Sequence, residues 1–405
     1  MRRYGNLWQG MISFLSLLRA ALTAQRGKRF RPSVAAFHFE LESELWRLHQ
    51  ELAEETYRPG RYHSFYVHEP KKRLISAAPY RDRVIHHALT QVLEPIFERT
   101  FIHDSYACRK GKGTHAAVRR DQHFSRQFRY VLKADIRKFF PSINHEILKG
   151  LIARKIKDPH VQWLIGRIID GSNPQEAVTL YFPGDDLFTP SERRRGIPIG
   201  NQTSQFFANV SLDPLDHYVK DRLRFGGYVR YVDDFLVFSN DKSELADAQE
   251  RIAEFLVPLR LRLHPTKNTI FPVTEGIRFL GYRVYPTHRL LVKDNVRRFR
   301  RRVRKLQRQY ADREIDLIDV RQRLMSWSGH ARQADTYVLR SRLFATISFQ
   351  RAKTEKPRVA RRVVQQQRAE CAVGQPQQQQ PGQPYQQQWF SCGEHFETGN
   401  LPAMP

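Results

Sequence analysis

Hydrophobic positions in the first half of the chain recur at helical spacing. Phe37, Leu41, Leu45, Leu48 and Leu52 lie three or four residues apart, with charged residues between them. One face of a helix carries such positions, so residues 1–60 are predicted to form a helical N-terminal region. The same spacing predicts helices over residues 80–99, from His115, over 145–152, around the residues Ala208, Leu212, Leu215 and Val219, and over 243–259.

Other stretches alternate with the period of a strand. Residues 62–75 predict a hairpin with basic residues at its turn, and residues 129–136 predict a buried strand that ends at Asp135. Residues 227–239 consist of two apolar, β-branched and aromatic runs that flank Asp233 and Asp234. This pattern predicts a hairpin with the two carboxylates at its tip. A strand and turn are expected over 261–269, and another short strand over 279–284.

Residues 293–349 are predicted to be helical and are rich in arginine. Val296, Phe299, Val303, Leu306 and Tyr310 form one apolar stripe, and the other faces carry Arg297, Arg298, Arg300, Arg301, Arg302, Arg304, Lys305 and Arg308. A single stripe can pack on the protein while the remaining faces contact a phosphate backbone. Residues 351–405, with their glutamine runs and prolines, cannot bury a core and are predicted to be a disordered tail.

Charge narrows the class of partner. The 405 residues carry a formal net charge of +27, which favours a polyanionic partner such as nucleic acid over an ordinary basic enzyme. The chain has 3 cysteines, none in a C-x-x-C pair, which argues against a disulfide framework or a zinc site. It has no apolar run of about 18 residues that would span a membrane. We therefore expect a cytoplasmic protein without a membrane partner.

Three carboxylates stand at predicted strand ends in this basic chain: Asp135, Asp233 and Asp234. Taken singly, Asp135 could be a helix N-cap and the pair a solvated acidic turn. Together they suit phosphoryl transfer with two divalent cations about 4 Å apart. Magnesium, with manganese as a substitute, prefers such all-oxygen sites.

The motifs resemble those of reverse transcriptases. Tyr231-Val232-Asp233-Asp234 is similar to the catalytic motif of that family, and residues 132–140 are similar to its first palm motif. Three further stretches occur in the family's order. Residues 196–205 resemble the motif that contacts template and nucleotide, residues 264–267 the lysine-bearing motif, and residues 279–282 the hydrophobic grip near the primer. Residues 73–87 and 105–114 resemble the finger motifs of the bacterial enzymes. The resemblance covers about residues 1–350.

The subtype is indicated by residues 199–205. Intron-encoded reverse transcriptases usually have Gln-Gly and Ser-Pro in this motif, whereas Ile199-Gly200 and Ser204-Gln205 resemble the enzymes of diversity-generating retroelements. Those enzymes copy template RNA with errors opposite adenine and use a small basic accessory protein. Group II intron or retron-type enzymes, including maturases that act mainly as RNA-binding proteins, are the alternative. An RNA-templated RNA polymerase is a second alternative, although that class usually has Gly at the position of Val232 and a small residue at that of Phe140.

The resemblance implies a role for each matched residue. Asp135 and Asp233 would bind both metal ions, Asp234 would support them, and Ile136 would offer its carbonyl. Phe140 would exclude a ribose 2′-hydroxyl, unless it is ordinary core packing. The remaining implied contacts are Lys267 as a general acid for pyrophosphate, Lys72 and Arg73 as clamps on the triphosphate, and Ile199 and Gly200 beside nucleotide or template.

The implied architecture is an α+β right-hand polymerase. Its parts are a helical N-terminal region (1–60), fingers and palm with an antiparallel sheet and helices (61–285) and a basic helical thumb (286–350). The disordered tail (351–405), predicted from its composition, is not part of the family's pattern. The partners are template RNA, the primer with its cDNA, and dNTPs.

Overall fold

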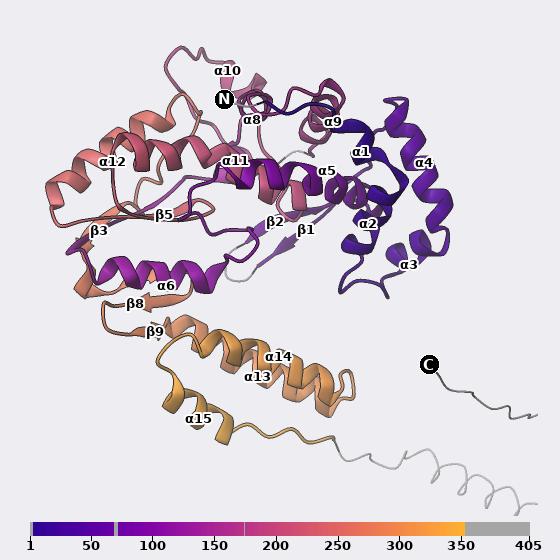
Figure 1. The fold of residues 1–405 in the computed structure, drawn as a ribbon. Coiled ribbons are helices and arrows are strands. Elements are labelled where there is room, and N and C mark those ends of the chain that lie inside the picture. The colour runs from indigo at the N-terminus through magenta and orange to yellow at the C-terminus, as the bar shows by residue number, and fades with distance from the viewer. Residues whose placement is uncertain (1–2, 69–71, 174, 353–405) are drawn as a thin grey trace, which may run out of the picture. The chain divides into compact units, whose positions relative to one another are not determined.

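The computed structural model describes residues 3–68, 72–173 and 175–352 (Figure 1). Residues up to Phe349 form one compact unit, which contains every element named below. The predicted tail, apart from its first two residues, lies outside the described residues, as do three residues at the turn of the predicted hairpin over 62–75.

Helices make up the N-terminal region, as predicted: α1 (Trp8–Ile12), α2 (Phe14–Ala24), α3 (Pro32–Phe39) and α4 (Leu41–Ala53). The Ser13 side chain caps α2 by accepting a hydrogen bond from the Ser16 amide. The apolar faces of α1, α2 and α3 pack on α5 (Tyr80–Glu98), and α4 packs on the other three helices. Leu17 of α2 and Val84 and Leu89 of α5 are fully buried. The periodicity of residues 37–52 is interrupted at Glu40, whose φ of −107° separates α3 from α4.

A four-stranded antiparallel sheet forms the centre of the fold, in the order β4 (Gly227–Tyr231), β5 (Asp234–Ser239), β3 (Tyr130–Asp135) and β6 (Thr269–Pro272). Alternate residues of β5 enter two different cores. Phe235 and Val237 join the core that contains residues of α11 (Gln202–His217) and α12 (Lys242–Leu256), whereas Leu236 and Phe238 join the core with α6 (Thr114–Ser125). The sheet is therefore buried on both faces, which explains its nearly continuous apolar strands.

Two smaller sheets flank the central one. The predicted hairpin over 62–75 exists as β1 (His63–Val67) paired with β2 (Arg73–Ala77). The sheet β7 (Ile277–Phe279), β8 (Tyr282–Val284) and β9 (Arg289–Leu291) packs beneath α6. The expected single strand over 279–284 is wrong, because Leu280 and Gly281 both have positive φ and form a hairpin turn. The other elements before residue 293 are α7 (Phe139–Ser142), α8 (His145–Ala153), α9 (Pro159–Asp170), α10 (Thr189–Glu192), the π-helix η1 (Tyr218–Arg222) and the 3-10 helix η2 (Val273–Glu275).

The basic C-terminal segment consists of α13 (Lys293–Ala311), α14 (Leu317–Ala331) and α15 (Tyr337–Ala345). The predicted apolar stripe of α13 is confirmed: Phe299, Val303 and Leu306 are buried, and the Phe299 ring stacks on Trp327 at 3.7 Å. Its arginines at 300, 301, 302, 304 and 308 are exposed. The helix therefore presents a cationic face to solvent.

Candidate active site

The predicted hairpin over residues 227–239 exists, but its two-residue turn consists of Val232 and Asp233. The expectation that Asp234 also lies at the tip is wrong, because Asp234 is the first residue of β5. Strand β4 ends at Tyr231 and β5 begins at Asp234, and these two residues are directly paired. Val232, the first turn residue, has a φ of 57°. A β-branched residue rarely adopts this left-handed conformation, and holding it there costs about 1–3 kcal/mol. The turn that carries Asp233 is therefore strained.

The third predicted carboxylate lies directly across the sheet from the turn. Asp135, the last residue of β3, is paired with Asp234 in the antiparallel register of β3 and β5. The next amide, that of Ile136, donates a hydrogen bond of 3.3 Å to the Asp233 carbonyl. The structure thus brings Asp135, Asp233 and Asp234 together at one end of the neighbouring strands β3 and β5, as expected from their positions at strand ends.

Burial and mutual repulsion perturb this carboxylate group. The pKa of Asp233 is raised to about 6, first by burial and then by the charges of Asp234 and Asp135, while Arg73 acts in the opposite direction. A perturbed carboxyl with charged neighbours in a cleft is typical of functional sites.

Lys267 lies beside the carboxylates. Its Nζ donates to Asp135 Oδ2 at 2.8 Å. The segment that carries it is held against β3, since the His264 amide donates to the Asp135 carbonyl at 2.7 Å and the Asp135 amide donates to Asn268 Oδ1 at 3.1 Å. Of the strand and turn expected over 261–269, the turn is present at residues 265–267, whereas the strand is reduced to a single bridge, Ile136 to Leu263, before β6 begins at Thr269.

The chemistry of these residues fits a divalent cation. Carboxylate oxygens are the ligands that Mg²⁺ prefers. A dication would offset both the burial and the repulsion from Asp234 and Asp135 that raise the pKa of Asp233. The arrangement is not a closed metal cage, however. Over the described ranges, no three His, Cys, Asp or Glu side chains are grouped to hold a metal ion, and Asp135 is paired with Lys267.

A cavity of about 200 Å³ opens next to the turn and collects five of the predicted site residues. Its lining includes Lys72, Arg73, Phe140, Ile199 and Asp233. These residues come from the β1–β2 hairpin, α7, the loop before α11, and the hairpin of β4 and β5. A pocket with cations at one side and a carboxylate at the other suits a polyphosphate that carries a cation.

Three polar residues that line this cavity were not predicted from the sequence: Lys138, Gln175 and Glu176. Lys138 pairs with Glu176 at 2.7 Å. Lys138 follows Asp135 within the first palm motif, so its proximity could have been inferred. The loop that carries Gln175 and Glu176 shows no periodicity or motif that would place it here.

Phe140 lies in the cavity wall beside its buried neighbour. It is partly exposed, whereas Phe139 is buried, and their rings meet edge to face at 5.5 Å. The Phe140 carbonyl accepts a hydrogen bond of 3.1 Å from the Ile197 amide, which ties α7 to the loop before α11. The backbone of Phe140 is therefore held at the loop before α11, and its ring contacts that of Phe139.

Ile199 and Gly200, both predicted to lie beside the nucleotide or template, have different roles in the structure. The Ile199 side chain lines the cavity, and its carbonyl accepts a hydrogen bond of 3.0 Å from the Ser76 amide in β2. Gly200 is not among the lining residues. Its φ is 121°, and a Cβ there would lie 3.1 Å from Ile75 Cγ2, so Gly200 allows the loop to approach β2 closely.

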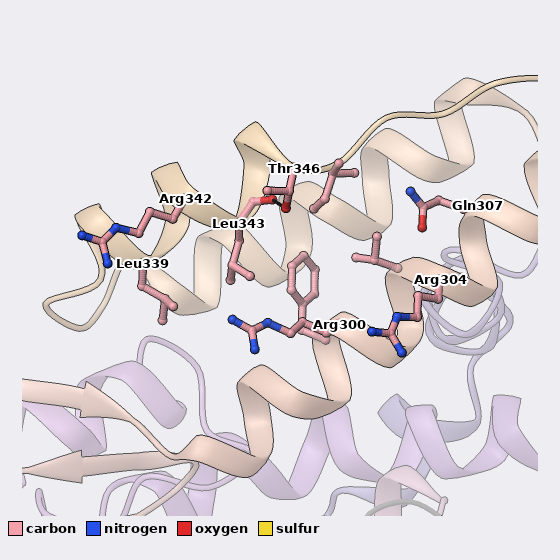
Figure 2. Close-up of a pocket in the computed structure, with 10 residues that line it drawn as sticks. Arg300, Arg304, Gln307, Leu339, Arg342, Leu343 and Thr346 are labelled. Carbon is pink, nitrogen blue, oxygen red and sulfur yellow. Dashed lines mark hydrogen bonds between the residues drawn. The ribbon is translucent and has the colours of Figure 1, made fainter.

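A second cavity, of about 590 Å³, lies between α13 and α15 (Figure 2). Arg300 and Arg304 extend into it from α13, and Arg342 comes from α15. Its floor is apolar and includes Phe299, Val303 and Leu343. It continues the cationic face of α13.

Acidic strand ends beside a cation-lined pocket, on an antiparallel sheet between helices, are typical of nucleotidyl-transferring polymerases. The family described as reverse transcriptase (RNA-dependent DNA polymerase) matches residues 67–284, and the chain belongs to this family. The α+β right-hand fold and the enzyme class expected from the sequence, an RNA-directed DNA polymerase, are thereby confirmed.

Individual relatives include proteins of introns. The chain is 25% identical to Protein YkfC of Escherichia coli strain K12 over 284 residues, which cover 60% of this chain and 72% of YkfC. It is 26% identical over 181 residues to the group II intron-encoded protein LtrA of Lactococcus lactis subsp. cremoris, covering 44% of this chain and 28% of LtrA. It is 27% identical over 270 residues to nuclear intron maturase 3, mitochondrial, of Arabidopsis thaliana, covering 60% and 36% of the two chains. The chain thus spans only about a third of the latter two proteins.

Among solved structures, apo telomerase from Candida tropicalis is similar with a TM-score of 0.43 and 12% identity, over 59% of this chain and 49% of that chain. Within the described residues, none of the helices has the length and apolar character needed to cross a bilayer.

Proposed function

We propose that the protein synthesises DNA on an RNA template by transferring nucleotides from dNTPs to a primer 3′-hydroxyl. The observation that carries this proposal is the cavity that joins Asp233 to Lys72, Arg73, Phe140 and Ile199. Residues 61–285 would form the fingers and palm, and residues 286–350 would form the thumb, which contacts the primer and template.

Asp135 and Asp233, with Asp234 and the carbonyl of Ile136, would hold two magnesium ions, which manganese could replace. When bound, the ions lower the pKa of the primer hydroxyl and neutralise the leaving pyrophosphate. Lys267 would release Asp135 to these ions and protonate the pyrophosphate. Until then, its ammonium group balances the charge of Asp135.

The cations of the cavity would bind the triphosphate. Arg73 lies close enough to Asp233 to affect its pKa, and Lys138 lines the same space. Lys72 lies over the Tyr66 ring at 4.4 Å and would leave that ring to reach a phosphate. Phe140 would contact the sugar of the incoming nucleotide.

Primer extension tests this function. Purified protein, a primed RNA template and Mg²⁺ should incorporate dNTPs, whereas NTPs should be poor substrates. Incorporation of NTPs alone would identify an RNA-templated RNA polymerase. Tight RNA binding without any incorporation would favour the second candidate, an RNA-binding protein of the maturase kind, which the similarity to LtrA and to nuclear intron maturase 3 supports.

We further propose that the polymerase serves a diversity-generating retroelement, together with a small basic accessory protein. The support is Ile199, whose apolar side chain lines the cavity where intron enzymes usually have glutamine. Without an amide at this position, the side chain cannot form a hydrogen bond with the nucleotide or the template.

Replacing Ile199 with Gln should lower misincorporation opposite template adenine. A net hydrogen bond of about 1 kcal/mol predicts a decrease of roughly two- to tenfold. Sequencing of cDNA made by the Ile199→Gln variant, with Ile199→Leu as the matched control, measures the effect. Equal error rates at adenine in all three proteins would contradict this role for Ile199.

Neutralising the exposed face of α13 should weaken binding of the primed template. Three exposed cations, Arg301, Arg304 and Arg308, can be changed together to Gln. For every phosphate that α13 no longer neutralises, the slope of log affinity against log salt should fall by about one, with little dependence on sequence. A control variant with Arg99, Arg222 and Lys242 changed to Gln removes three exposed cations from other elements. Equal salt slopes in the two variants would show that α13 is only a solvated helix.

A further inference from the structure

A fully buried ion pair lies behind the turn that carries Asp233. Arg230, on β4, and Asp216, on α11, both have side chains that are 0% exposed. The guanidinium group donates from Nε to Asp216 Oδ1 and from Nη2 to Asp216 Oδ2, each at 2.6 Å. This bidentate arrangement fixes the orientation of the arginine as well as its position.

The remaining nitrogen of the same guanidinium group reaches the turn itself. Arg230 Nη1 donates to the carbonyl of Val232 at 3.0 Å and to Asn209 Oδ1 at 3.3 Å. The Tyr228 hydroxyl completes the group by donating to Asp216 Oδ1 at 2.8 Å. One side chain therefore connects two positions of α11 with the residue that immediately precedes Asp233.

Helix α11 also leads to the cavity of about 200 Å³ that Ile199 and Asp233 line, here called the nucleotide cavity. It begins at Gln202, directly after the loop of Ile199 and Asn201. Asn201 Oδ1 accepts a hydrogen bond of 3.2 Å from the Ala78 amide, and Asn201 Nδ2 donates to the Ser76 carbonyl at 3.3 Å. The helix is thus anchored to the β1–β2 hairpin at its start and to the turn of Asp233 through Arg230.

Stability alone does not account for such a pair. Desolvating two charges is expensive, and apolar residues of similar volume are often at least as stabilising. Val232, in contrast, adopts a strained conformation, and strained residues persist only where the surroundings over-determine them. The hydrogen bond from Arg230 to the Val232 carbonyl supplies such a constraint.

We propose that Arg230, held by Asp216, is a positioning residue that fixes the Val232–Asp233 turn relative to the nucleotide cavity. This inference rests on the proposed polymerase function. In this role the buried pair of Arg230 and Asp216 affects the rate of nucleotide addition although neither side chain contacts the substrate.

The test compares two carboxylates of the same helix. Asp216→Asn and Arg230→Lys disturb the proposed device. Asp213→Asn is the matched control, since Asp213 also lies on α11 and pairs with a buried cation, Lys155, at 3.4 Å, rather than with Arg230. For each variant we would measure the rate constant of single-nucleotide incorporation, the affinities for primed template and dNTP, the melting temperature, and amide exchange of the peptide 228–238.

The Asp216→Asn and Arg230→Lys variants should lose at least about tenfold in the incorporation rate constant, equivalent to about 1.4 kcal/mol. Their template affinity should be unchanged, and exchange in peptide 228–238 should be faster. Asp213→Asn should show neither effect. A double variant, Arg230→Met with Asp216→Leu, removes the buried charges and should recover the melting temperature but not the rate.

Recovery of the rate together with stability in the double variant would overturn the proposal. Exchange in Asp216→Asn and Arg230→Lys at the level of Asp213→Asn would overturn it as well. If the wild-type protein incorporates no nucleotide, the polymerase function fails, and the exchange comparison alone decides whether Arg230 fixes the turn.

Discussion

Replacing Asp233 with Asn should reduce primer extension by about 10³-fold or more, equivalent to at least about 4 kcal/mol of transition-state stabilisation. Asp233 is the carboxylate that both occupies the tip of the turn and lines the nucleotide cavity. An amide in its place keeps the shape but removes the negative charge that a divalent cation requires. Primer extension on an RNA template, at saturating Mg²⁺ and dNTP, measures the loss.

The same variant should not lose stability. Burial and the charges of Asp234 and Asp135 raise the pKa of Asp233 to about 6, so its ionised form is less favourable in the folded protein than in the unfolded chain. Removing the charge should leave the melting temperature unchanged or raise it, when measured without divalent ions. A variant that gains stability while losing activity would mark Asp233 as a functional residue, whereas a fall in both would indicate a structural role.

Two matched variants complete this experiment. Asp247→Asn removes an exposed carboxylate of α12 and should leave activity unchanged. Asp234→Glu should retain more activity than Asp233→Glu, because Asp234 is paired with Tyr231 and Asp135 within the strands and is not part of the cavity lining. Activity of Asp233→Asn close to that of Asp247→Asn would contradict the proposed active site.

The carboxylate cluster could be predicted because its causes are local. Alternation predicts where β3 ends and, to within one residue, where the hairpin turns, and antiparallel pairing then brings Asp135 opposite Asp234. The helical stripe of α13 was predictable for the same reason, since its period lies within one element. The strained φ of Val232 could not be predicted from the alternation, because it depends on tertiary contacts that hold the turn, such as the hydrogen bond from Arg230 to the Val232 carbonyl.

The partners of Arg230 could not be predicted, since they depend on tertiary contacts between distant segments. In sequence Arg230 is one of many arginines, and only its packing against α11 distinguishes it from the exposed ones. Likewise, the loop with Gln175 and Glu176 reaches the cavity through the arrangement of several elements. The hairpin of β7 and β8 was missed because Leu280 adopts a positive φ that sequence gives no reason to expect.

Replacing Phe140 with Ala should relax the preference for dNTPs over NTPs by on the order of 100-fold, as expected for a steric contact to one substituent. The ring is partly exposed in the cavity that contains Asp233 and Ile199. Its backbone is tied to Ile197, so it cannot retreat readily from a 2′-hydroxyl. Incorporation of matched dNTP and NTP pairs on one template measures the ratio.

Packing provides the competing explanation, because the Phe140 ring also contacts Phe139 edge to face at 5.5 Å. A purely structural role predicts that Phe140→Ala lowers the melting temperature and slows both substrates alike, leaving the ratio unchanged. Phe140→Tyr preserves the ring and should preserve the discrimination, whereas Phe140→Val should give an intermediate ratio. A ratio that follows the size of the residue at position 140, independently of the melting temperature, would identify this ring as the element that selects deoxynucleotides.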